Sequence, residues 1–85
     1  KTEAELAHIR ETMEMDGAAL CEFFAWFEDH VGKEKISELM VDEHITAARA
    51  RRPHFVCPSF STIAAFNANG AMPHYQATES SYAWI

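Results

Sequence analysis

The first third of this chain carries one apolar stripe, which constrains the fold more than any other feature. Thr2 and Glu5 have the spacing of a capping box, a signal that marks a helix start. Apolar residues then recur at helical spacing as far as Gly32: Leu6, Ile9, Met13, Leu20, Phe24, Phe27 and Val31. The pattern predicts a helix over about residues 2–31, roughly 45 Å long. Because the chain has only 85 residues, such a helix is expected to need more protein around it than this chain supplies.

A second apolar face opens in the C-terminal half of the same helix. Cys21, Phe23 and Trp26 lie beside the first stripe and widen it. We therefore expect this half of the helix to be buried on two sides. Gly17 interrupts the pattern and lowers helix stability by roughly 1 kcal/mol relative to alanine. It indicates either a tolerated defect or a place where the helix bends or another backbone comes close.

The next segment predicts a second helix over about residues 37–51. Ser37 is a favourable N-cap residue, and Pro53 ends the pattern because the residue before a proline disfavours helix. Its last turn contains three arginines, which suit the negative end of a helix dipole: Arg49, Arg51 and Arg52. In a chain of net charge −6, these arginines are expected to be solvated charges rather than a phosphate-binding patch.

Beyond the second helix the pattern becomes extended. Phe60 to Phe66 has the aromatic and β-branched composition of a strand, and Asn69-Gly70 is a strong hairpin-turn signal. Pro73 cannot donate to a ladder, so the return strand is expected at a sheet edge. The chain is thus predicted to be one α+β domain at most. It would contain a long helix, a second helix and a β-hairpin over about residues 60–76, with a further strand beginning near Tyr82.

Charge and composition exclude several functional classes. The chain has 13 acidic and 7 basic side chains and a net charge of −6, which disfavours nucleic acid and anionic membrane surfaces as partners. No apolar run reaches the roughly 18 residues of a membrane span, and no export leader is visible. Cys21 and Cys57 are too few for a disulfide-stapled secreted module. They are expected to be buried, reduced thiols of a cytoplasmic protein.

Five histidines raise the question of a metal or catalytic site. Glu5 and His8 have the spacing found in di-iron helical bundles, but such a site needs a second motif and further carboxylates. His30 is expected near a helix C-terminus, where a partly charged imidazole is favourable. His74 differs, because it follows Pro73, whose ring restricts the backbone. An imidazole held in this way is a candidate proton or carbonyl partner in catalysis.

Four segments, taken in order, resemble the catalytic domain of the aminopeptidase P (Xaa-Pro aminopeptidase) family. Asp16–Glu28 resembles the opening helix of that domain, and Ile36–Leu39 resembles the start of its second helix. Pro58–Ala64 and Asn67–Tyr75 resemble its first β-hairpin. The segments occur in the family's order and at about its spacing, and together they cover nearly the whole chain.

The resemblance implies a pita-bread fold (creatinase/aminopeptidase-like), with residues 1–85 as the N-terminal part of a single catalytic domain. It also implies a metallopeptidase hydrolase that cleaves the bond before a proline in the second position of a peptide. Family members use two divalent metal ions, usually manganese, which hold an attacking hydroxide. Their ligands are two aspartates, a histidine and two glutamates. None of these has a match in this chain, so the chain alone is expected to hold no catalytic metal and to be inactive.

The resemblance also singles out His74. It matches the family's active-site histidine that follows the Asn-Gly turn. In the family this histidine is not a metal ligand; it lies at the metal centre and hydrogen-bonds the substrate near the scissile bond. His74 is therefore the expected catalytic and substrate-binding residue of a longer enzyme.

Two other interpretations stay open. A pita-bread relative with different chemistry, such as a prolidase, a creatinase-like enzyme or a non-catalytic binding protein, would share these segments. A self-associating helical interaction module would instead pack its two-sided apolar helix against a second copy. A homo-oligomer is expected, because uncovered helix faces and strand edges favour association.

Overall fold

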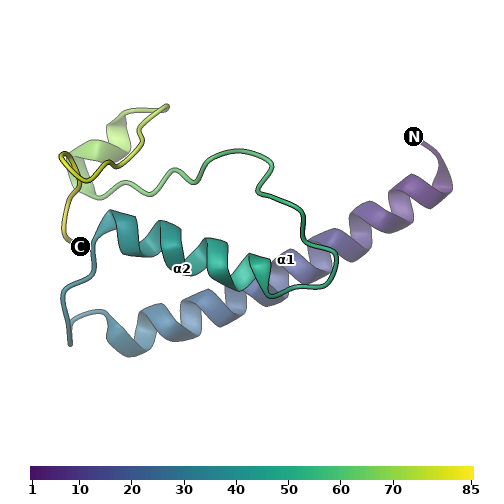
Figure 1. Cartoon of the computed structure of the whole chain (residues 1–85), viewed down its shortest axis with the longest axis horizontal. Helices are drawn as coiled ribbons and strands as arrows, with labels where there is room; N and C mark the ends of the chain where they lie inside the picture. Colours follow the sequence, from purple (N-terminus) through teal and green to yellow (C-terminus); the bar gives the residue numbers. More distant parts are fainter.

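The computed structural model describes residues 1–85 as two antiparallel helices with an irregular segment folded across one side (Figure 1). Helix α1 spans Glu3–His30 and helix α2 spans Glu38–Ala50, and a short 3-10 helix, η1, spans Asn67–Ala71. The chain after α2 runs back over the helix pair to the end where α1 stops and α2 starts (Figure 1). Neither long helix contains a stretch apolar enough to cross a membrane.

Local signals at both ends of α1 explain its length. The hydroxyl of Thr2 accepts a hydrogen bond from the Glu5 amide at 3.1 Å, and the Glu5 carboxylate accepts one from the Thr2 amide at 3.2 Å. These reciprocal bonds complete the predicted capping box. At the other end, Gly32 adopts a positive φ of 82°, which glycine accommodates without strain. A Cβ atom placed on Gly17 would meet nothing within 4 Å, so close approach of another backbone does not explain that glycine.

The core lies between the C-terminal half of α1 and α2. Its buried members are Ala19, Phe23, Ile45 and Ala48. The two alanines are fully buried, so the helices approach closely where their side chains are small. Phe23 fills the space beside them and is 7% exposed. The helix pair is therefore joined through Ala19 and Phe23 of α1, with Leu20, Trp26 and Phe27 packed beside them.

The first apolar stripe, by contrast, is largely uncovered. Ile9 is 44% exposed, Met13 is 60% exposed and Phe24 is 52% exposed. The N-terminal turns of α1 extend past the end of α2, so nothing covers them (Figure 1). In the C-terminal half of α1, for which burial on two sides was predicted, the prediction holds only in part: Leu20 and Phe27 pack against the core, whereas Phe24 and Cys21 are exposed. Periodicity identifies two apolar faces, but it does not say which of them a 13-residue partner helix will cover.

The arginines at and just beyond the C-terminal end of α2 also make contacts that were not predicted. Arg49 Nε donates to Asp16 Oδ1 at 2.6 Å, and Arg51 Nε donates to Glu22 Oε1 at 2.6 Å. Arg52 Nη2 donates to the second oxygen of Glu22 at 3.3 Å. All three arginines are thus partners of acids on α1, and Arg51 is also a solvated charge, as expected. The antiparallel arrangement brings the C-terminal end of α2 beside the middle of α1, which sequence spacing does not reveal.

Removing the Asp16 charge is expected to weaken the helix pair. Asp16→Asn should lower the free energy of unfolding of the chain by about 1 kcal/mol, because the pair is charge-assisted but partly screened by water. Urea denaturation followed by circular dichroism measures the change. Asp29→Asn is the matched control, since Asp29 is 72% exposed and lies 3.5 Å from Lys33. Equal losses in the two variants would contradict an interhelical role for Asp16.

The hairpin predicted over residues 60–76 is not present in this structure. Residues 60–66 have no strand partner, and η1 occupies the position of the predicted hairpin turn. The amide of Phe66 donates to the carboxylate of Glu38 instead of to a second strand. Pro73 has no donor to offer in return. The turn signal thus predicts a bend correctly, but no ladder forms beside it, and one of the amides that a ladder would use, that of Phe66, donates to Glu38 of α2.

The end of the chain does pair, but with the entry to α2. Ser37 and Trp84 form an antiparallel bridge. The Glu38 amide donates to the Ala83 carbonyl at 3.0 Å, and the Ile85 amide donates to the Ile36 carbonyl at 2.7 Å. This pairing joins the C-terminal residues to the start of the second helix.

Both cysteines are exposed and unpaired, which corrects the expectation that they are buried. Cys21 belongs to α1 but is not a member of the core that faces α2. Cys57 lies in the irregular segment after α2. The helix pair leaves too little covered surface to enclose them: only 7 of 85 residues are buried.

Candidate functional site

The most enclosed polar group of the molecule is the carboxylate of Glu38, whose side chain is fully buried. Its Oε1 accepts hydrogen bonds from the Tyr75 hydroxyl at 2.7 Å and from the Ala83 amide at 2.8 Å. Its Oε2 accepts from the Phe66 amide at 2.6 Å and from Asn69 Nδ2 at 3.1 Å. Four donors therefore meet about four lone-pair sites of one carboxylate.

Glu38 reaches this position because of how α2 begins. Ser37 is the N-cap, and its hydroxyl accepts a hydrogen bond from the Met40 amide at 3.1 Å. Glu38 follows as the first helical residue, where a negative charge favours the helix dipole. The pairing of Ser37 with Trp84 brings the C-terminal segment beside the carboxylate. The start of α2 thus places the Glu38 side chain, and the long-range pairing brings donors to it.

The environment keeps Glu38 ionised. Burial raises the pKa of this carboxyl, but the hydrogen bonds from Tyr75, Phe66, Ala83 and Asn69 outweigh burial and lower the pKa from 4.5 to about 2. The hydrogen bond to Glu38 raises the pKa of Tyr75 above its usual value of 10.0, and burial adds to that shift. At neutral pH the pair is therefore a buried carboxylate and a neutral phenol.

His74, the predicted catalytic residue, lies beside this network. It is exposed and occupies a turn that is closed by a hydrogen bond from the Tyr75 amide to the Met72 carbonyl at 3.2 Å. The Met72 amide in turn donates to the carbonyl of Asn69 at 3.1 Å. The imidazole makes no hydrogen bond within the chain, so its ring nitrogens are free to meet a ligand.

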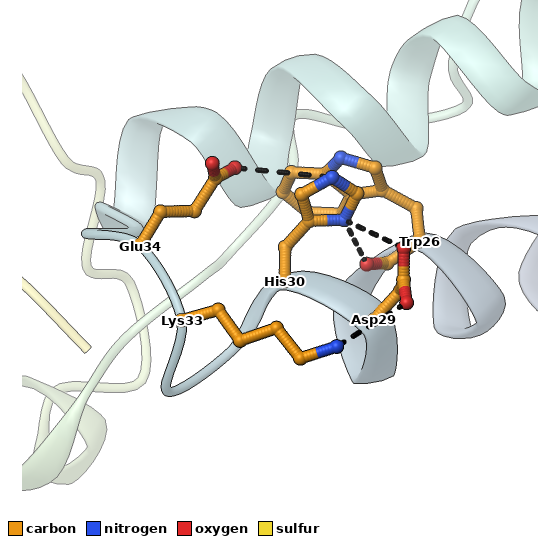
Figure 2. Close-up of polar contacts among 5 residues, drawn as sticks. All are labelled: Trp26, Asp29, His30, Lys33 and Glu34. Atoms are coloured by element: carbon orange, nitrogen blue, oxygen red, sulfur yellow. Dashed lines mark hydrogen bonds and ion pairs between the residues drawn. The ribbon is translucent and has the colours of Figure 1, made fainter.

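The His30 side chain contacts neighbouring residues at the end of α1 and is not part of the Glu38 network (Figure 2). Its Nδ1 lies 2.7 Å from the Trp26 carbonyl, which can only accept, so this nitrogen carries the hydrogen. Its Nε2 lies 3.9 Å from a carboxylate oxygen of Glu34. The ring thus binds a carbonyl near the end of the helix, as expected for an imidazole at a helix C-terminus.

His44 also has a packing role, because its ring stacks on Trp26 with a centroid distance of 3.6 Å.

The remaining acids and histidines do not assemble a metal centre. Glu5 caps the amide of Thr2, and His8 is exposed on the first turns of α1. No group of three or more His, Cys, Asp or Glu side chains is arranged to hold an ion. The donors of this chain therefore do not fit a resident metal, and no chemical step through a metal follows from them.

Comparison with known proteins establishes the family. The sequence model of metallopeptidase family M24 matches residues 7–83. The chain belongs to this metallopeptidase family. It is similar to proteins described as "Probable Xaa-Pro aminopeptidase P" from Pyricularia oryzae (42% identical), Metarhizium robertsii (40%) and Arthroderma gypseum (41%).

Each of these three similarities covers 100% of the chain but only 14% of the relative. No solved structure matches the chain. Membership of family M24 implies the pita-bread fold. The resemblance read from the sequence is thereby confirmed at the level of the family.

Sequence reasoning missed the network around Glu38. It assigns Ser37 to a helix cap and finds nothing unusual in the acidic residue that follows. The donors to Glu38 are 28 to 45 residues away along the chain. In the sequence, Tyr75 is notable only as the neighbour of His74. An acidic residue directly after the N-cap Ser37 was the one available signal, and acids are common in the first turn of a helix.

Proposed function

We propose that this chain is part of a metallo-aminopeptidase that releases the N-terminal residue preceding proline from peptides. The observation that carries the proposal is the 40–42% identity over the whole chain to relatives named Xaa-Pro aminopeptidase P. Because the chain spans 14% of those relatives, the activity would belong to a longer protein. That protein would supply the ligands for two divalent ions, with manganese as the proposed metal. Two exposed, unpaired cysteines fit a reducing compartment such as the cytoplasm.

His74 is the residue of this chain that we assign to the reaction. We propose that its imidazole hydrogen-bonds the peptide next to the scissile bond. Its exposure and its uncommitted ring nitrogens support this role. Such a contact places the carbonyl for attack and strengthens as charge develops on the reacting atoms. Two divalent ions, held by residues outside this chain, would supply an activated water as the nucleophile.

A panel of matched peptides tests the proposed activity. The full-length protein, loaded with manganese, should release the first residue from peptides of three or more residues with proline in the second position. The same peptides with alanine there should be cleaved at least about tenfold more slowly, because a proline pocket discriminates by shape. Mass spectrometry of the products measures both rates. Cleavage of Xaa-Pro dipeptides alone would indicate a prolidase, and no cleavage of any peptide would contradict the proposal.

A further inference from the structure

Both sides of the turn that carries His74 are anchored to the same buried group. On the C-terminal side, the Tyr75 hydroxyl donates to Glu38 Oε1 at 2.7 Å. On the N-terminal side, Asn69 Nδ2 donates to Glu38 Oε2 at 3.1 Å. The carbonyl of Asn69 then accepts from the Met72 amide at 3.1 Å. His74 is thus one residue from one anchor and is linked to the other through Met72.

The anchors also hold one another. Asn69 Nδ2 lies 3.1 Å from the Tyr75 hydroxyl oxygen, which can accept while its own hydrogen goes to Glu38. The Ser81 carbonyl lies 2.9 Å from the same hydroxyl. A hydroxyl has one hydrogen, so the carboxylate and this carbonyl compete for it, and the charged acceptor forms the stronger bond. The Tyr75 hydroxyl therefore donates to Glu38 and accepts from Asn69, and a turn of the ring away from Glu38 would break both hydrogen bonds.

We propose that Glu38 is a positioning residue, which holds the Met72–Tyr75 turn from both sides through Tyr75 and Asn69 and thereby orients the His74 imidazole. The inference rests on the proposed function of His74 but assigns a role to a residue outside the substrate contacts. Glu38 belongs to α2, which packs against α1 through the core. The carboxylate therefore fixes the irregular segment relative to a rigid helix. Its ionised state supports this role, because it offers only acceptors to the donors around it.

A substitution of Tyr75 tests the proposal without removing the buried charge. In the full-length protein, Tyr75→Phe keeps the ring and loses the hydrogen bond to Glu38. We expect kcat for an Xaa-Pro peptide to fall about tenfold, because a small displacement of a positioned group lowers the rate strongly. KM should change less than about twofold, since the His74 contact that Tyr75 positions is strongest in the transition state. Tyr82→Phe is the matched control, because the Tyr82 ring packs edge-on against Trp84 and its hydroxyl is not part of the network.

A double-mutant cycle separates positioning from a general loss of structure. If Tyr75 acts through His74, Tyr75→Phe should change kcat less than about twofold in a His74→Ala background, because coupled residues are not additive. An equal loss in both backgrounds would overturn the proposal, as would a wild-type rate for Tyr75→Phe. Rates are compared at a temperature at which circular dichroism shows equal helix content.

The same experiment distinguishes a failure of this proposal from a failure of the proposed function. A wild-type rate for His74→Ala would remove His74 from the reaction and would overturn both assignments. A large loss for His74→Ala, together with no loss for Tyr75→Phe, would leave the function of His74 intact and overturn only the role of Glu38.

Discussion

Replacing His74 by alanine in the full-length protein is expected to lower kcat/KM for Xaa-Pro peptides by about 10²–10³-fold. The loss is expected because the proposed hydrogen bond to the substrate grows stronger as charge develops at the scissile carbonyl. Stability should be nearly unchanged, since His74 is exposed and makes no hydrogen bond within the chain. Steady-state kinetics on one proline peptide, with circular dichroism on the same samples, measures both quantities.

His8→Ala provides the control for this result. His8 is also an exposed histidine, and it lies on the N-terminal part of α1, far along the chain from His74. Its replacement should leave kcat/KM within about twofold of the wild type, since surface substitutions of this kind are close to neutral. If the two variants had equal activity, His74 would have no part in the reaction. Partial activity in His74→Gln, which keeps a hydrogen-bonding group, would support the proposed contact.

Replacing Glu38 by glutamine is expected to lower the free energy of unfolding of the chain by about 2–3 kcal/mol at pH 7. The carboxylate accepts from four donors, whereas an amide offers one accepting oxygen and turns its own NH₂ group toward those donors. Two of the present donors would lose their acceptor: either Tyr75 and the Ala83 amide, which share Oε1, or Asn69 and the Phe66 amide, which share Oε2. Urea denaturation monitored by circular dichroism measures the loss. Glu43→Gln is the control, because Glu43 is an exposed glutamate of the same helix.

The pH dependence of stability gives an independent measure of the same group. The pKa of Glu38 is about 2 in the folded chain, whereas its ordinary value is 4.5. Because the folded pKa is the lower one, the contribution of Glu38 is complete above pH 4.5 and is lost as the pH falls toward 2. The wild type should therefore lose stability over this interval, and Glu38→Gln should lose less. Parallel acid profiles for the two proteins would show that Glu38 is not held as a buried carboxylate.

The helices could be predicted from the sequence because their signals are local. The capping box of Thr2 and Glu5, Gly32 after α1 and the N-cap Ser37 all act within one turn of a helix end. The family could also be identified, because an ordered set of segments carries the resemblance. The covered face of α1 could not be predicted. Phe23 and Phe24 are equally apolar neighbours, and only the packing of α2 buries the first and exposes the second.

The site divides in the same way. His74 is recognisable in the sequence because Pro73 and the Asn-Gly turn stand close to it. The role of Glu38 depends on donors from residues 66, 69, 75 and 83, which lie far along the chain and converge only in the folded molecule. In the sequence, a glutamate whose carboxylate accepts four hydrogen bonds cannot be distinguished from a glutamate at a solvated helix end. The difference lies in the loss of water around the buried group, and tertiary structure alone decides which acidic residue loses it.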